Sequence, residues 1–122
     1  MLRSVIGIVL GSAMGAGLTR GENINWFSDA GKTNLDSSGA AMNAGFRFEL
    51  GVFDGGFVPN AGNLAEWASH WQPVQRVSYN PSTSRFAAVF TVSGNPPPFI
   101  SGATAYVWGF RGSPSSSEWI LF

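Results

Sequence analysis

The stretch that decides the fold is FRFELGVFDGGFVP, residues 46–59. It opens with the alternation of a β-strand, in which the apolar residues Phe46, Phe48 and Leu50 share one face. Arg47 and Glu49 share the other face, where cross-strand ion pairing explains them without a catalytic role. We therefore expect three core side chains and two solvent-facing charges, so that this stretch builds the fold and not a site.

The rest of the chain carries more short strands, expected at residues 23–27, 74–79, 85–92, 103–110 and 118–122. Asp54-Gly55-Gly56 is a turn sequence, and Pro59 soon stops any second arm, so that a hairpin and a wide turn are both compatible with it. The strands before and after the turn NPSTS should form a β-hairpin. About six or seven short strands without βαβ alternation predict a mainly β fold, either an antiparallel sandwich or a curled sheet.

One short helix is expected over about residues 63–72. Asn63 can cap it, and Glu66 stands three positions later, where a capping box has its second member. The apolar residues Leu64, Trp67, Ala68 and Trp71 follow at the spacing of one helix face, and Pro73 ends the pattern. A helix this short needs a sheet to dock on. The expected core comprises Phe46, Phe48, Leu50, Leu64, Trp67, Trp71 and Val107.

Composition limits the class of protein. A chain of 122 residues is long enough for one domain. Seven Lys and Arg residues balance seven Asp and Glu residues, which argues against a nucleic-acid binder, because phosphate binding needs a basic face. The chain has no cysteine, which excludes thiol catalysis and zinc fingers. We expect no cofactor, and hydrophobic residues at 44% supply a core without disulfides.

The N-terminus has the features of a secretory signal peptide over residues 1–17. Arg3 precedes an uncharged run that is shorter than the about 20 apolar residues of a membrane span. Small residues at Ala13 and Gly15 suit a cut after Gly15, and a cut after Gly17 is nearly as good. The alternative is an N-terminal strand or buried helix. Export would leave one β-rich domain, residues 22–122, in the periplasm, on the cell surface or outside the cell.

No catalytic constellation stands out. His70, the single histidine, falls off the apolar helix face and has neither a cysteine nor a neighbouring carboxylate at the spacing of metal ligands, which favours a structural or surface role and argues against a metal site. A hydrolase would need two carboxylates about 5–10 Å apart. Glu49 and Glu118 lie on or beside different strands and could approach, but nothing requires it. Gly31-Lys32-Thr33 matches the end of a phosphate loop, yet Trp26 stands where that motif has glycine.

Aromatic side chains offer the other candidate site. Trp26, Tyr79 and Trp108 lie on expected strands, where an exposed row could stack on sugar rings in the manner of a carbohydrate-binding module. Trp108 lies in YVWGF, whose neighbours are apolar on both sides. A core position is therefore favoured, because monomers rarely expose large apolar patches.

Three segments, FRFELGVFDGGFVPNAGNLAEWASHW, AYVWGF and SSEWILF, follow in this order after the N-terminal segment. They resemble the N-terminal domains of bacterial exosortase-sorted (PEP-CTERM-type) surface proteins, over residues 22–122. The resemblance implies a non-catalytic surface or extracellular-matrix protein that contacts polysaccharide or other envelope proteins. In that family the chain continues to a Pro-Glu-Pro motif, a membrane-spanning segment and a basic tail. This sequence shows none of them, so we expect a truncated C-terminus and a membrane link only through the signal peptide or a missing anchor.

Overall fold

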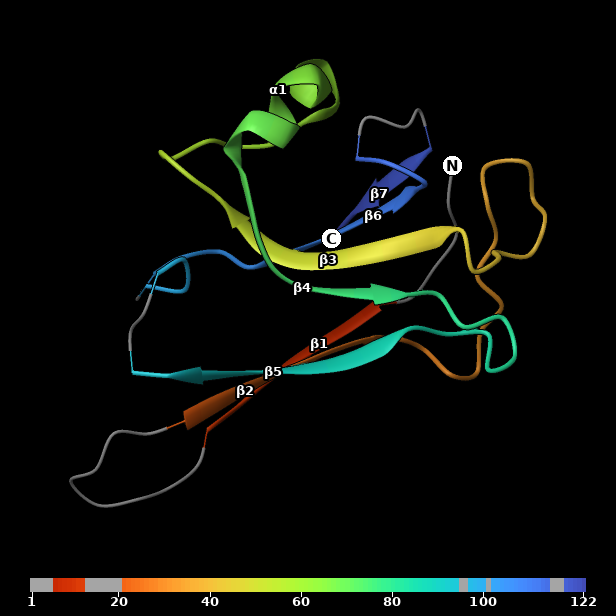
Figure 1. The fold of residues 1–122 in the computed structure, drawn as a ribbon, viewed down its shortest axis with the longest axis horizontal. Coiled ribbons are helices and arrows are strands. Elements are labelled where there is room, and N and C mark those ends of the chain that lie inside the picture. The colour runs from red at the N-terminus through yellow and green to blue at the C-terminus, as the bar shows by residue number, and fades with distance from the viewer. Residues whose placement is uncertain (1–5, 13–20, 95–96, 101, 115–117) are drawn as a thin grey trace.

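The chain folds into two antiparallel sheets with one short helix. The computed structural model describes residues 6–12, 21–94, 97–100, 102–114 and 118–122. These residues form a three-stranded and a four-stranded sheet, which lie one above the other, with the helix beyond the four-stranded sheet (Figure 1). The prediction of a mainly β fold with one short helix is confirmed.

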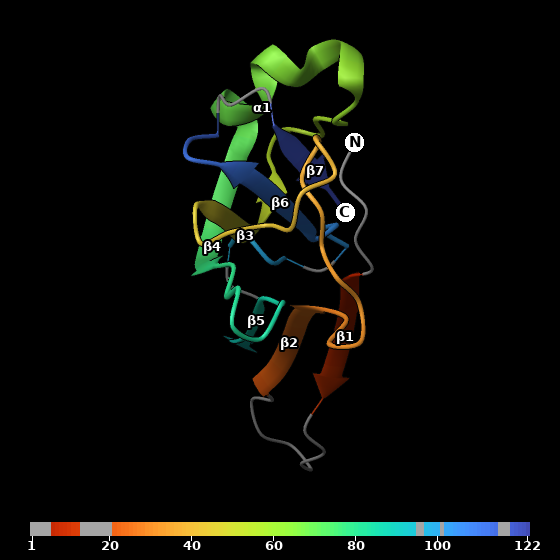
Figure 2. The same cartoon turned by 90° about the vertical axis from the view of Figure 1, so that its right-hand side faces the viewer.

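The strand order is β1-β2-β5 in one sheet and β4-β3-β6-β7 in the other. The first sheet contains β1 (Ile6–Ser12), β2 (Gly21–Ser28) and β5 (Ala87–Ser93). The second contains β3 (Phe46–Phe53), β4 (Trp71–Ser78), β6 (Tyr106–Arg111) and β7 (Trp119–Leu121). The 3-10 helix η1 (Ala61–Asn63) leads into α1 (Leu64–His70), which Figure 2 shows at the end of the molecule away from β1 and β2.

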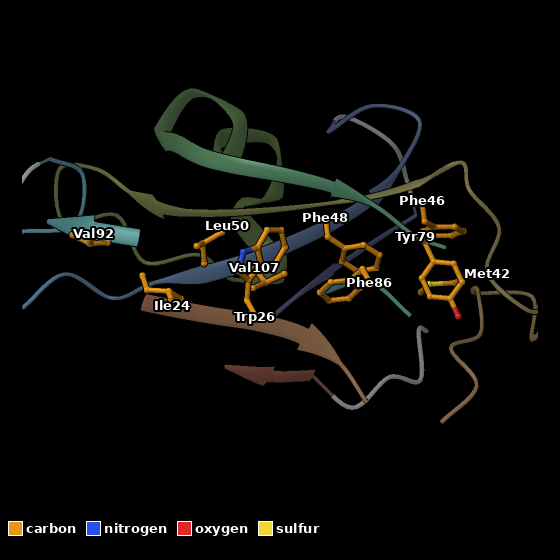
Figure 3. Close-up of a cluster of buried hydrophobic side chains, with 10 residues drawn as sticks. All are labelled: Ile24, Trp26, Met42, Phe46, Phe48, Leu50, Tyr79, Phe86, Val92 and Val107. Carbon is orange, nitrogen blue, oxygen red and sulfur yellow. The ribbon is translucent and has the colours of Figure 1, made fainter. Parts of the chain in front are cut away.

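The main core lies between the two sheets (Figure 3). Phe48 on β3 stacks on Phe86 with the ring centroids 3.9 Å apart, and Phe86 in turn contacts Trp26 of β2. Gly109 of β6 lies against the Phe48 ring, and a Cβ at this glycine would come within 2.5 Å of it. The buried members of this core are Ile24, Trp26, Met42, Phe46, Phe48, Leu50, Tyr79, Phe86, Val92 and Val107.

A second aromatic core lies between α1 and the other face of the four-stranded sheet. Trp67 of α1 packs edge to face on Trp108 of β6, with the ring centroids 5.5 Å apart. Trp67, Trp108 and Phe110 are buried there, and Leu64 and Trp71 are partly buried. Trp71 is the first residue of β4 and no longer belongs to the helix. The four-stranded sheet is therefore covered on both faces.

This second core overturns the expectation that Glu49 faces solvent. Glu49 is only 3% exposed, whereas Arg47 is exposed as predicted. The carboxylate of Glu49 accepts hydrogen bonds from Arg76 Nε at 3.0 Å and Nη2 at 2.7 Å, and from the Trp71 indole at 3.3 Å. Arg76 stands directly opposite Glu49 on β4, so the pairing is cross-strand but not on an exposed face. The helix and its aromatic residues cover the face that strand alternation assigned to water.

The predicted hairpin of residues 74–79 and 85–92 is wrong. An isolated bridge joins Asn80 and Arg85 at the turn, but β4 then pairs with β3 and β5 pairs with β2, in different sheets. Both strands bury apolar side chains in the one core between the layers, and a flat hairpin would place them side by side in the same layer. Gln75 of β4 spans the separation: its amide oxygen accepts the Trp26 indole N–H at 2.8 Å, and its Nε2 donates to the Val89 carbonyl at 3.0 Å.

The helix also begins differently from the prediction. Asn63 makes no side-chain cap for α1, and the capping box belongs to η1, where Asn60 accepts from the Gly62 amide and Asn63 accepts from the Asn60 amide, each at 2.8 Å. Asn63 also accepts the Trp67 indole N–H at 2.8 Å. The asparagine that the pattern marks as a cap therefore fixes the buried tryptophan of the helix.

Part of the predicted signal peptide lies in the sheet. Residues 6–12 form β1, which pairs with β2 along its whole length. The two expected cuts fall among residues 13–17, outside the described residues.

Candidate functional site

The three candidate stacking residues are all buried. Trp26, Tyr79 and Trp108 are 0%, 3% and 1% exposed. Trp26 and Tyr79 belong to the core between the sheets, and Trp108 lies beneath α1. None of them presents a ring face to a ligand, so the exposed aromatic row that a carbohydrate platform requires is not formed by these residues.

A groove lies instead beside the turn that follows β3. Its volume is about 630 Å³. It is lined by two stretches of the chain, residues 54–58 and residues 97, 98, 100 and 102–104, and by Val52, Phe53, Gln72 and Tyr106. Val58 and Ile100 are large apolar residues that are 71% and 53% exposed at its rim. We call this feature the turn groove; it falls within the volume range of small-ligand sites.

Asp54 braces the wall of the turn groove by bonding to His70. The sequence did not predict this pair. Asp54 Oδ1 lies 2.9 Å from His70 Nδ1, and Asp54 Oδ2 accepts a hydrogen bond from Gln72 Nε2 at 3.0 Å. The Phe57 ring stacks on His70, with the centroids 4.3 Å apart. Asp54 and His70 are sixteen positions apart, and only the pairing of Phe53 with Trp71 at the adjoining ends of β3 and β4 brings them together.

The hydrogen bond with His70 lowers the pKa of Asp54, and the bond from Gln72 adds to this effect. A carboxylate and the histidine that it orients are two of the three members of a nucleophilic triad. The third member is a hydroxyl bonded to the ring, and no hydroxyl among the described residues hydrogen-bonds to His70. The bonds of Asp54 to His70 and Gln72 hold the turn of the groove wall against the start of β4.

Two further carboxylates, Asp36 and Glu118, hold loops. Asp36 Oδ1 accepts from the Ser38 amide and hydroxyl and from the Ala40 amide, and these bonds, with Ser38 the largest cause, lower the pKa of Asp36. Glu118 accepts from the amide and hydroxyl of Ser37, both at 2.7 Å, which lowers the pKa of Glu118. Glu118 also pairs with Arg111 at 3.4 Å.

Glu49 and Glu118, the pair considered for hydrolysis, therefore belong to different networks. Glu49 is bound to Arg76 and Trp71 beneath α1, and Glu118 ties the start of β7 to the loop at Ser37. Across the part of the chain that the structure describes, no three potential metal ligands from His, Asp and Glu come together. Within the same residues, no helix has the length and apolar character to cross a membrane.

In comparisons with known proteins, no family model, no curated protein and no solved structure matches this chain.

Proposed function

We propose that this protein is a non-catalytic domain of an exported surface or matrix protein, and that its role is binding and cohesion. The observation that supports this best is that three carboxylates accept hydrogen bonds that hold turns and loops. Asp36, Asp54 and Glu118 have pKa values lowered by structural hydrogen bonds. A hydrolase that works near neutral pH needs a carboxyl group whose pKa is raised, so that it can donate a proton.

The turn groove is the binding site in this proposal. It combines apolar rim residues, Val58 and Ile100, with the half-buried ring of Tyr106 and the polar side chains of Asp54 and Gln72. Ligand sites typically have such a mainly apolar lining with a few polar groups. The expected partners are polysaccharide or other envelope proteins. The carbohydrate-binding alternative stays a candidate through Tyr106, not through the three buried aromatic residues.

Binding to isolated envelopes tests this proposal. The folded protein is mixed with envelopes of the cells that make it, and the fraction that sediments with them is measured. We expect Val58→Glu with Ile100→Glu to reduce this fraction at least tenfold, because two charges at the rim oppose an apolar contact. Val89→Glu is the matched control, since Val89 is 54% exposed and lies outside the groove.

The same assay separates the partners. Binding that survives protease treatment of the envelopes indicates polysaccharide, and binding lost after this treatment indicates protein. Equal sedimentation of the groove variant and the control would contradict the groove as the site. Release of soluble sugar from the envelopes during incubation would contradict a non-catalytic role.

A further inference from the structure

The strand that covers the edge of β2 is the strand that export would remove. β1 pairs with β2 from Ile6 opposite Ser28 to Ser12 opposite Glu22. The two expected cuts, after Gly15 and after Gly17, both fall between β1 and β2. Processing therefore takes away the whole of β1 and leaves this edge of β2 without a neighbour. This step rests on the proposed function, in which the protein is exported.

Alternate residues of β2 direct their backbone groups to that edge. In an antiparallel ladder, the N–H and C=O of one residue point to one neighbouring strand, and those of the next residue point to the other. The Ser28 amide donates to the Phe86 carbonyl at 3.0 Å, on the side of β5. The backbone groups of Asn23, Asn25 and Phe27 therefore point to β1. In the processed protein they form a row of unpaired donors and acceptors, which is a template for another strand.

The other edges of the two sheets are poorer templates for pairing with a further strand. β5 faces β4 across the separation that Gln75 spans, where the Val89 carbonyl already accepts a hydrogen bond. β7 is three residues long, and short edge strands are poor templates. β2 has eight residues and contains neither lysine nor proline, two of the residues that commonly block edge pairing.

We propose that β2 of the processed protein pairs with β2 of a second copy, antiparallel about a two-fold axis at Asn25. This register places Ile24 of one copy opposite Trp26 of the other, so that the core-facing side chains of both strands lie side by side on the same face of the joined sheet. It places Glu22 opposite Ser28, so that the one charge of the strand does not face itself. Such self-complementarity is what a two-fold interface requires, and the two sheets join into one with the order β5-β2-β2-β5.

The unprocessed chain cannot pair in this way, because β1 occupies the edge. The signal segment then has a second role besides targeting: it keeps copies apart until the protein has crossed the membrane. Pairing of β2 supplies the cohesion between copies that a matrix protein needs.

The experiment measures the mass of the assembled protein in solution. The full-length gene is expressed in an exporting bacterium, the processed protein is recovered, its N-terminus is fixed by intact mass, and light scattering is recorded over a range of concentrations. We expect twice the chain mass for the processed protein and one chain mass for its Asn25→Pro variant, which loses an edge N–H. Val89→Pro is the matched control: Val89 lies opposite Asn25, its N–H points away from β2, and the dimer should persist.

A second variant protects the test against misfolding. Asn25→Lys keeps every backbone hydrogen bond but places two like charges on the two-fold axis. We therefore expect a monomer at low salt and a dimer at 1 M salt, where the Debye length is only about 3 Å and the repulsion is screened. A correctly processed, folded protein that stays monomeric at all concentrations would overturn this inference alone. A chain that keeps Met1 would overturn the export on which it rests, and this inference with it.

Discussion

At the scale of single residues, neighbouring positions of one strand show what sequence could and could not predict. The alternation in FRFEL correctly indicated that Phe46, Phe48 and Leu50 would be buried together. It could not indicate that the opposite face would also be covered, because that depends on a helix placed over the sheet by residues more than ten positions away. Glu49 is therefore a buried carboxylate whose charge is balanced by Arg76 on the next strand.

Removal of Arg76 should be costly, and removal of Arg47 should not. We expect Arg76→Ala to lower the free energy of unfolding by about 3 kcal/mol, the low end for a broken buried pair because Arg76 is itself half exposed. Arg47→Ala, an exposed arginine two residues from Glu49, should change it by less than about 0.5 kcal/mol. Chemical denaturation of both variants measures this, and equal losses would show that the Glu49 charge needs no partner.

Asp54 gives a prediction about pH. Its pKa in the folded protein is below the ordinary value of 3.8, chiefly through the hydrogen bond with His70. The stabilisation is therefore complete above that value, where the carboxylate is ionised in both states. It is lost as the pH falls through the folded pKa, because the unfolded chain takes up the proton first. We expect Asp54→Asn to be less stable than wild type at pH 6, and the difference to shrink as the pH falls below 3.8. A difference that stays constant with pH would contradict this role of Asp54.

At the scale of elements, local patterns predicted where strands and the helix lie, but not which strands become neighbours. The turn NPSTS predicted a hairpin, and the bridge between Asn80 and Arg85 forms there. The strands on either side still separate, because two layers are needed to enclose Trp26, Phe48 and Phe86. Likewise, Asn63 was identified from its position before a helix, whereas its bond to the Trp67 indole depends on the tertiary arrangement.

The two asparagines before the helix, Asn60 and Asn63, should contribute differently to the stability of the fold. We expect Asn63→Ala to cost about 2 kcal/mol, because it leaves the indole N–H of the buried Trp67 without a partner as well as breaking the capping box. Asn60→Ala removes only a cap and should cost about 1 kcal/mol. Thermal unfolding of the two variants ranks them, and a larger loss for Asn60→Ala would contradict this account of the helix.

Gln75 should be required to join the two sheets. Gln75→Leu leaves the indole N–H of Trp26, a residue with no exposed surface, unpaired, so we expect a loss of about 1–3 kcal/mol. Gln72→Leu is the matched control on the same strand, because its side chain bonds only to the partly exposed carboxylate of Asp54. Chemical denaturation compares them, and a negligible effect of Gln75→Leu would show that apolar packing alone holds the sheets together.

At the scale of the whole molecule, the sequence predicted the fold class but not the turn groove, the candidate binding site. Short alternating runs, frequent turns and one apolar helix face were enough to predict a mainly β domain, which the two antiparallel sheets confirm. The turn groove involves residues from 52 to 106. Its shape depends on how the ends of β3, β4 and β6 meet, and no spacing along the chain encodes that meeting. The aromatic residues that the sequence suggested as sugar-binding are instead buried in the two cores.

We propose above all that this protein works outside the cytoplasm as a binding domain. The most direct measurement is the intact mass of the native protein, taken separately from the cytoplasmic, envelope and external fractions of its own cells. We predict a chain that begins at residue 16 or 18 and is found in the envelope or the external fraction. A chain that retains Met1 and stays in the cytoplasmic fraction would contradict the account.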